Sequence, residues 1–283
     1  MTTKPNFIAH FRAVLSSRQS ALCVGLDPEL SKLPAALPRT CAGMARFCQE
    51  LIEATAEYAA AFKINFAFFE AYGHAGWEAL ERVAAAIPAS CLKIADAKRG
   101  DIGNTARLYA RAIFEELQFD AMTANPYLGE DAALPFLEDA RHGVFFLCRT
   151  SNPGSGSVQW YPAQPGQRDS GKSQPLFVHI AQLVNSWNQH QNAALVVGAT
   201  YPSELQIVRQ CAPELPFLIP GVGAQGGDLA AAVKHGVTSF GDLAVINVSR
   251  GIMYASSGKD FATAAAKQAA ALRQEIRQQI DQL

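Results

Sequence analysis

The sequence has 283 residues, of which 49% are hydrophobic, so the chain can bury a large core as one barrel domain or as two smaller domains. Its 24 Lys and Arg residues against 25 Asp and Glu give a formal net charge of -1, which excludes the broad basic surface that nucleic acid or an anionic membrane would require. There is no signal-peptide pattern and no apolar run near the roughly 18 residues of a membrane span, so we expect a cytoplasmic protein with no nucleic-acid or membrane partner.

Short apolar runs, each followed by a helical pattern, recur along the whole chain. The eight runs predicted to be strands span residues 21–27, 61–69, 91–98, 119–126, 143–150, 193–200, 217–223 and 243–250. Segments between them, such as 43–60 and 104–118, repeat apolar residues at helical spacing. Eight such units predict the α/β class and a closed (β/α)8 TIM barrel, with residues 1–283 as a single domain. An open α/β sheet is the alternative.

Polar residues collect where the predicted strands end. They are Asp27, Lys63, Asn65, Asp96, Lys98, Asn125, Thr150, Ser151 and Arg250. In barrels of this type the C-terminal strand ends and the loops after them carry the chemistry, so we expect the active site there.

The third predicted strand leads into LKIADAKRGDIGNT, which sets Asp96, Lys98 and Asp101 in the pattern D-x-K-x-x-D. Asp96 and Lys98 are two residues apart and share one face of the strand. Because adjacent parallel strands lie about 4.8 Å apart, Lys63 on the preceding strand can join them in one charged array at the barrel mouth. A salt bridge that merely closes the barrel is the alternative, and Asp101 could equally be the N-cap of a helix beginning near Ile102.

The one long irregular stretch, residues 151–173, is rich in Gly, Pro, Ser and Gln, and we expect it to form a lid. Within it, GQRDSGKS at 166–173 matches the phosphate-binding pattern G-x-x-x-x-G-K-S of nucleoside triphosphatases. That pattern binds phosphate only where a buried strand leads through it into a helix. The preceding SVQWYPAQP, with its two prolines, does not read as a central strand, so we interpret the match as a chance occurrence.

Two glycine-containing segments, GVGAQGG at 221–227 and SRG at 249–251, follow the last two predicted strands. This is the usual phosphate site of barrels. Glycines such as Gly223 and Gly251 let backbone N–H groups approach phosphate oxygens, and Arg250 can add two parallel, charge-assisted hydrogen bonds to the phosphate. An ordinary Gly-rich turn is the alternative.

The segment DAKRGDI resembles the signature of the orotidine 5'-monophosphate decarboxylase family, and the chain is similar to its longer bacterial branch. VGLDP, FKINFAFFE, the SNPGS run, PGVGAQGGD and the Arg250 segment follow in the family's order over nearly the whole chain. The Asp-Lys motif alone is shared with related sugar-phosphate decarboxylases and aldolase-like barrels, so specificity lies in the combination. The resemblance implies a lyase that converts orotidine 5'-monophosphate (OMP) to UMP and CO₂ in pyrimidine biosynthesis without a cofactor.

The resemblance also implies roles for individual residues. Asp27 would bind the ribose hydroxyls, and Lys63 and Asp96 would belong to the charge network. Lys98 would be the proton donor, and Ser151 would contact the pyrimidine.

On the phosphate side, the resemblance implies that Gln225 bridges pyrimidine and phosphate and that Arg250 binds the phosphate. The arginine is followed here by Gly251, a departure from the shorter-chain branch that leaves its main role intact. Asp101 and Thr105 would reach into the site of the neighbouring subunit, which implies a homodimer with shared active sites.

No metal centre is expected, because the six cysteines contain no C-x-x-C pair and the six histidines no i, i+4 pair. Fixed charges would then have to stabilise the carbanion that loss of CO₂ leaves at C6. Two rival functions stay open from the sequence. One is a decarboxylase of keto sugar phosphates that requires Mg²⁺, and the other is a phosphosugar or nucleotide sensor built on a degenerate barrel.

Overall fold

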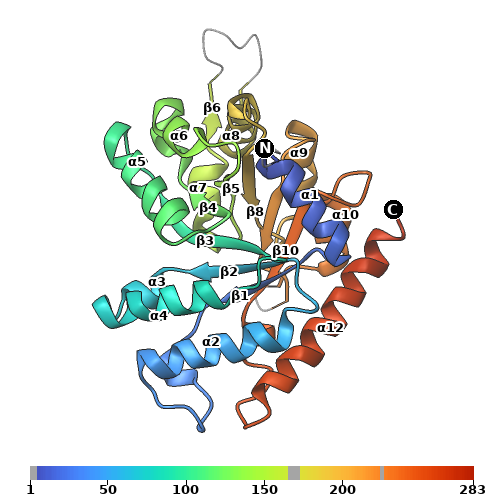
Figure 1. Cartoon of the computed structure of the whole chain (residues 1–283). Helices are drawn as coiled ribbons and strands as arrows, with labels where there is room; N and C mark the ends of the chain where they lie inside the picture. The colour runs from blue at the N-terminus through green and yellow to red at the C-terminus, as the bar shows by residue number, and fades with distance from the viewer. Residues whose placement is uncertain (1–4, 165–172, 224–225) are drawn as a thin grey trace.

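The computed structural model describes residues 5–164, 173–223 and 226–283 and shows a closed barrel of eight parallel strands surrounded by helices (Figure 1). The order around the barrel is β1-β10-β9-β8-β5-β4-β3-β2, so β1 pairs with both the last strand and β2. The strands are β1 Leu22–Leu26, β2 Ala61–Asn65, β3 Leu92–Arg99, β4 Ala121–Ala124, β5 Gly143–Arg149, β8 Ala193–Val197, β9 Phe217–Pro220 and β10 Ala244–Val248. The predicted (β/α)8 barrel is confirmed, and its closure excludes the open sheet.

Helices cover the outside of the barrel (Figure 1). The longer ones are α1 Phe7–Arg18, α2 Cys41–Thr55, α4 Gly73–Ala86, α5 Gly103–Arg111, α6 Glu130–Leu137, α8 Leu176–Trp187, α9 Pro202–Cys211, α10 Leu229–Gly236 and α12 Phe261–Ile280. Shorter helical turns are η1 Leu30–Lys32, α3 Ala67–Glu70, η2 Ala112–Glu116, η3 Pro126–Leu128, η4 Pro153–Ser155, α7 Gly156–Gln159 and α11 Arg250–Met253. Within the described ranges, none of these helices has the length and apolar character that crossing a membrane requires.

The barrel strands are near-continuous apolar runs because helices cover their outer faces and side chains fill the interior. Every residue of β1, β8 and β10 is buried. At the N-terminal end of the barrel, the ring of Phe7 on α1 lies 5.9 Å from the ring of Phe145 on β5, nearly perpendicular to it. The Phe7 amide also donates to the carbonyl of Ala140. Helix α1 therefore packs at the end of the barrel opposite to the cavity described below.

Most strands are shorter than the sequence predicts, with β8 and β9 each ending three residues early. In two others, helical turns begin directly at the strand end. The run 61–69 reads as one strand, but β2 ends at Asn65 and α3 begins two residues later. Phe66 already has helical angles, and the Asn65 side chain accepts a hydrogen bond from the amide of Ala67 at 3.2 Å. The run 119–126 ends early in the same way, because a proline starts η3.

The described part of the predicted lid has more regular structure than its composition suggests. After β5 the chain forms η4 and α7, and β6 Pro162–Ala163 then pairs antiparallel with β7 Gln174–Pro175. Residues 151–164 therefore lead away from the barrel to β6, and β7, which pairs with β6, is followed directly by α8 (Figure 1). Residues 165–172, which hold most of the GQRDSGKS match, lie outside the described residues.

Candidate active site

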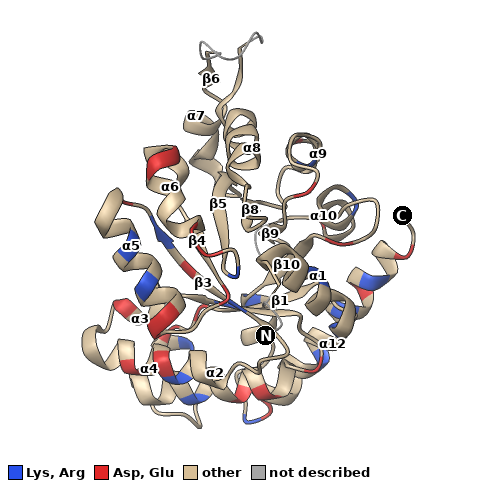
Figure 2. Cartoon of the chain, turned by 45° about the horizontal axis from the view of Figure 1, so that its top comes forward, with Lys and Arg blue, Asp and Glu red and all other residues tan. Residues whose placement is uncertain are grey.

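A cavity of about 510 Å³ opens at the C-terminal ends of the barrel strands, and every strand, or the segment directly after it, contributes to its wall. Its lining residues are Asp27, Lys63, Asn65, Asp96, Lys98, Thr123, Leu147, Thr150, Ser151, Asn152, Gln159, Val196, Leu218, Pro220, Gly221, Val222, Asn247, Ser249 and Arg250. In Figure 2 the strand β3 carries both signs of charge among strands that are mostly uncharged. The volume suits a small-molecule ligand, and the position is the one where barrels carry their chemistry.

Four charged side chains from β2, β3 and the turn after β1 form a connected array in the cavity wall. The Nζ atom of Lys63 lies 2.8 Å from Oδ2 of Asp96, and Nζ of Lys98 lies 2.5 Å from Oδ1 of the same carboxylate. Nζ of Lys63 also lies 3.6 Å from Oδ1 of Asp27. Asp96 therefore offers one oxygen to each lysine, and the charges alternate in sign along the array.

The array is buried at one end and exposed at the other. The side chain of Lys63 is 5% exposed and that of Asp96 11%, whereas that of Lys98 is 49% exposed. Burial alone lowers the pKa of Lys63, but the carboxylates of Asp96 and Asp27 outweigh it and raise this pKa above its usual value. Burial raises the pKa of Asp96, but the two lysines outweigh it and hold this pKa well below its usual range. Lys63 and Asp96 therefore stay charged at neutral pH, and the Lys98 ammonium is the one that can meet a ligand.

The end of β3 is irregular, and this irregularity places Lys98. Between two regular pairs with β4, three residues of β3 stand opposite Thr123 alone. Lys98 has a φ of 48°, a left-handed conformation that costs a residue with a Cβ atom about 1–2 kcal/mol. The buried Oγ1 of Thr123 accepts a hydrogen bond from the Lys98 amide at 2.9 Å and donates one to Oδ1 of Asp96 at 3.1 Å. Thr123 thus fixes both the strained backbone and the shared carboxylate.

The turn after β1 places Asp27 in the cavity wall, where one of its carboxylate oxygens accepts no hydrogen bond from the described residues. Its Oδ1 is buried and has no hydrogen-bond partner among the described residues, because its distance to Lys63 suits an ion pair but is too long for a hydrogen bond. The hydroxyl of Tyr254 accepts from the Glu29 amide at 2.9 Å and donates to the Asp27 carbonyl oxygen at 3.4 Å. Burial raises the pKa of Tyr254 to about 12, so this hydroxyl keeps its proton. A buried acceptor without a donor suits a ligand hydroxyl.

Arg250 stands at another side of the cavity, directly after Ser249 and the end of β10. The absence of a side chain on Gly25 lets β10 come close to β1, since a Cβ atom there would lie 1.9 Å from Oγ of Ser249. Gly221 and Val222, after β9, line the neighbouring wall. An exposed guanidinium beside a glycine-containing turn suits an anion.

The loop after β5 supplies the polar groups of a further side. Thr150, Ser151 and Asn152 line the cavity, and Gln159 of α7 joins them. The Gln159 amide donates to Oγ1 of Thr150 at 2.8 Å and accepts from the Thr150 N–H at 3.0 Å. Apolar side chains from β5, β8 and β9 line the cavity beside this loop.

The structure brings together six of the residues predicted for the site: Asp27, Lys63, Asp96, Lys98, Ser151 and Arg250. Gly223 and Gly251 are chain neighbours of lining residues, whereas Gln225 lies outside the described residues. Asp101 and Thr105 are not among the described residues that line the cavity. They lie between the end of β3 and the first turn of α5, at the margin of the barrel mouth.

The alternative of a plain helix cap for Asp101 is not what the structure shows. Helix α5 begins at Gly103 with Ile102 in the N-cap position. The Oδ1 atom of Asp101 instead accepts a hydrogen bond from the amide of Ile102, the next residue, at 2.8 Å.

The polar lining residues that the sequence analysis missed as site residues include Thr123, Asn247 and Gln159. Thr123 and Asn247 are single polar residues in otherwise apolar strands and are 1% and 7% exposed. A lone polar residue in such a strand was the available signal, because buried polar groups need a partner. Gln159 lies in a Gly/Ser/Gln-rich segment and offered no such signal.

Comparisons with known proteins agree on one family. The sequence model of the "Orotidine 5'-phosphate decarboxylase / HUMPS family" matches residues 20–267. The orotidine 5'-phosphate decarboxylase of Herpetosiphon aurantiacus is 50% identical over 266 residues, which cover 94% of this chain and 96% of that protein. The structure of Leishmania donovani OMP decarboxylase matches with a TM-score of 0.78 and 40% identity, covering 95% of this chain and 99% of that one. The structure of Leishmania donovani UMP synthase matches with a TM-score of 0.79 and 42% identity, covering 92% of this chain but 56% of that one.

Proposed function

The chain belongs to the orotidine 5'-phosphate decarboxylase family, and on that premise we propose that its charged array is the centre at which this carboxy-lyase converts OMP to UMP and CO₂. The relatives do not favour the Mg²⁺-dependent sugar-phosphate decarboxylase. The main support for placing the reaction centre here is the array itself, in which the exposed Lys98 and the buried Lys63 both bind the buried carboxylate of Asp96.

Loss of CO₂ leaves a carbanion at C6, and the Lys98 ammonium is the group placed to stabilise and protonate it. A substrate carboxylate bound beside Lys98 also faces ionised Asp96, so its departure relieves a repulsion. A like-charge pair at about 4 Å contributes only about 4 kcal/mol at an effective dielectric of about 20, against roughly 8–23 kcal/mol of total enzymatic catalysis. Repulsion alone is therefore insufficient, and the fixed charges together with binding of the rest of the nucleotide supply the remainder.

The other parts of the nucleotide meet groups of matching chemistry. The unused Oδ1 of Asp27 accepts a hydrogen bond from a ribose hydroxyl. The guanidinium of Arg250 binds the 5'-phosphate, and Gln225 bridges phosphate and pyrimidine. Ser151 contacts the pyrimidine from the loop after β5. Phosphate binding, remote from C6, drives closure of the segment 151–173 over the site.

Replacement of Lys98 tests the placement of the centre. In Lys98→Ala, kcat for OMP should fall by roughly 10⁴-fold or more, because the ammonium acts on charge that forms only in the transition state. UMP should still bind within about tenfold of the wild-type affinity. Lys234→Ala, which removes an exposed lysine of α10, is the control and should match the wild type. Equal losses of UMP binding and turnover in Lys98→Ala would contradict the role.

We also propose that the chain works as a homodimer in which Asp101 and Thr105 complete the partner's site. Both lie at the margin of the mouth and outside their own cavity lining. Exposed large apolar side chains lie at the start of α5 and on α5, η3 and α6, and α6 contacts both α5 and η3. Figure 1 shows α5 and α6 side by side. These side chains are Ile102, Leu108, Tyr109, Tyr127, Leu128 and Leu134. Such a patch marks an interaction surface, and a two-fold axis would bring two copies of it together.

Subunit mixing tests the shared site. Lys98→Ala and Asp101→Ala homodimers should each be inactive, but mixing them gives hybrids with one doubly altered site and one intact site. Random pairing makes about half of the dimers hybrid, so activity should return to roughly a quarter of the wild-type value. If mass spectrometry shows that hybrids form and they stay inactive, Asp101 serves its own chain.

A further inference from the structure

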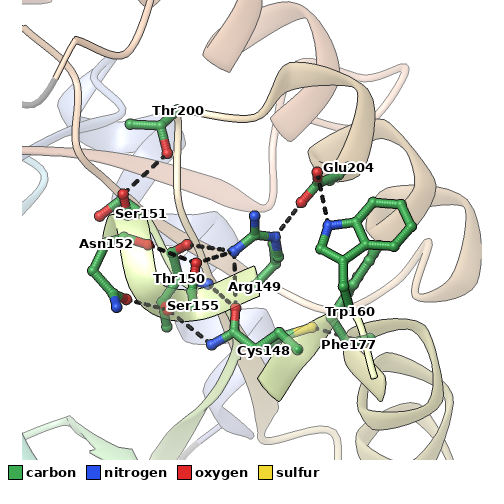
Figure 3. Close-up of polar contacts among 11 residues, drawn as sticks. Cys148, Arg149, Thr150, Ser151, Asn152, Ser155, Trp160, Phe177, Thr200 and Glu204 are labelled. Atoms are coloured by element: carbon green, nitrogen blue, oxygen red, sulfur yellow. Dashed lines mark hydrogen bonds and ion pairs between the residues drawn. The ribbon is translucent and has the colours of Figure 1, made fainter. Parts of the chain in front are cut away.

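Arg149, the last residue of β5, is a buried cation with partners on two sides (Figure 3). On one side its Nε donates to the carboxylate of Glu204, on α9, and its guanidinium lies 3.9 Å from the ring centroid of Tyr201. On the other side its Nη1 donates to the Thr150 carbonyl oxygen at 2.9 Å and to the Ser155 hydroxyl. The side chain of Arg149 is 3% exposed and that of Glu204 12%, so the pair is withdrawn from water.

The groups that Arg149 holds belong to the loop that lines the cavity. Its Nη1 also donates to Oε1 of Gln159 at 3.0 Å, and the same oxygen accepts from the Thr150 N–H at 3.0 Å. The Thr150 hydroxyl donates to Oδ1 of Asn152 at 2.7 Å, and the Ser155 hydroxyl donates to the Asn152 carbonyl oxygen at 2.6 Å. The Arg149 guanidinium therefore connects the start of the segment after β5, at Thr150, with its later residues Ser155 and Gln159.

Glu204 connects that segment to the barrel wall from the other side. Its Oε1 accepts a hydrogen bond from Nε1 of Trp160 at 3.2 Å, while Oε2 receives Arg149 (Figure 3). The loop is also seated closely on β8, because a Cβ atom at Gly198 would lie 2.8 Å from the amide nitrogen of Ser151. The position of the loop is thus determined by α9 and β8 as well as by its own turns.

A buried ion pair contributes little to the stability of a fold, because desolvation of the two charges offsets their attraction and apolar side chains of similar volume often stabilise the fold as well or better. The pair instead fixes positions, because the planar guanidinium donates hydrogen bonds in defined directions and so holds several acceptors in place at once. We propose that the Arg149–Glu204 pair is a positioning device that holds Thr150, Ser151 and Gln159 in place at the cavity and thereby sets affinity for the pyrimidine half of the nucleotide. The proposal rests on the function proposed above, and neither Arg149 nor Glu204 lines the cavity.

Two ligands separate this role from a general structural one. UMP carries the pyrimidine and ribose 5-phosphate lacks it, so loss of loop positioning should weaken UMP alone. In Arg149→Met and in Glu204→Gln, which keeps the shape of the side chain, the Kd of UMP should rise by about tenfold or more, because a charge-assisted hydrogen bond is worth about one decade in an equilibrium constant. The Kd of ribose 5-phosphate should stay within about twofold. For OMP, KM should rise while kcat stays within about threefold, since the array at Lys98 is untouched.

Arg209→Met is the matched control. Arg209, on α9, is a half-buried arginine that, like Arg149, lies over an aromatic ring, but it donates to backbone carbonyl oxygens away from the cavity, such as that of Gly236. The Arg209→Met substitution should lower the melting temperature and leave the affinities for UMP and ribose 5-phosphate unchanged. Equal weakening of UMP and ribose 5-phosphate in the Arg149 and Glu204 variants, or no change in either, would overturn the proposal. Wild-type protein that fails to decarboxylate OMP would instead contradict the proposed function, so the two failures are distinguishable.

Discussion

Thr123→Val probes how the array is held rather than the array itself. Valine has nearly the shape of threonine, and residue 123 is 1% exposed, so the packing of β4 is preserved. The change removes the hydroxyl that accepts from the Lys98 amide at 2.9 Å and donates to Asp96 at 3.1 Å. Lys98 then loses the contact that holds its left-handed backbone, and its ammonium moves relative to the reacting carbon.

The size of the effect follows from the two hydrogen bonds. The one to ionised Asp96 is worth about 1.5–3 kcal/mol and the one to the amide about 0.5–1.5 kcal/mol. If the whole of this sum is lost from the transition state, kcat falls by roughly 30-fold to 1600-fold, at about 1.4 kcal/mol for each decade. Because Asp96 keeps both lysines, we expect a loss near the lower end, about 30-fold in kcat.

The assay follows the absorbance change as OMP becomes UMP, with UMP affinity and the melting temperature measured on the same preparations. Thr123→Ser restores the hydroxyl and should recover most of kcat. A Thr123→Val enzyme with kcat within about threefold of the wild type would refute the positioning role of the hydroxyl.

Three further predictions concern other parts of the site. Arg250→Ala should mainly raise KM, with rescue by added guanidinium, and an unchanged KM would remove Arg250 from the phosphate site. Asp96→Asn should lower the free energy of unfolding by about 3 kcal/mol, because two lysines lose their shared partner. The pKa of Asp96 is lowered in the folded protein and that of Lys63 is raised, so urea titrations should give a constant difference between about pH 5 and 9. The difference should shrink as the pH falls below about 4, where Asp96 of the unfolded chain takes up a proton while folded Asp96 stays ionised. Tyr254→Phe, which keeps the ring but removes the hydrogen bonds to the turn after β1, should weaken ribose 5-phosphate binding by about threefold to tenfold in calorimetry, and unchanged binding would show that the turn holds without it.

The barrel and much of the charged array could be predicted from the sequence because local patterns determine them. The eight apolar runs alternate with helical patterns, and the i, i+2 spacing of Asp96 and Lys98 predicts that their side chains lie together, although the irregular end of β3 that places Lys98 is not predicted by it. Lys63 is one polar residue in an apolar strand that directly precedes β3 in the chain, and sequential strands of a parallel barrel are neighbours.

Features that depend on contacts distant in sequence could not be predicted. Arg149 and Glu204 are 55 residues apart, and no local pattern indicates that the helix after β8 meets the end of β5. Gln159 lies in a segment whose composition predicts irregular structure, yet tertiary contacts form η4 and α7 there. The end of β2 at Asn65 was missed because the run to 69 stays apolar while the backbone already turns helical.

We propose that fixed charges of this chain, with Lys98 as proton donor, decarboxylate OMP without a metal or cofactor. The most direct test is turnover of OMP by EDTA-treated protein in D₂O, with UMP analysed by mass spectrometry and NMR. We predict one UMP and one CO₂ for each OMP consumed, a deuteron at C6 of every UMP, and a rate that added Mg²⁺ leaves unchanged. Absence of UMP, or turnover that appears only when Mg²⁺ is restored, would contradict the account.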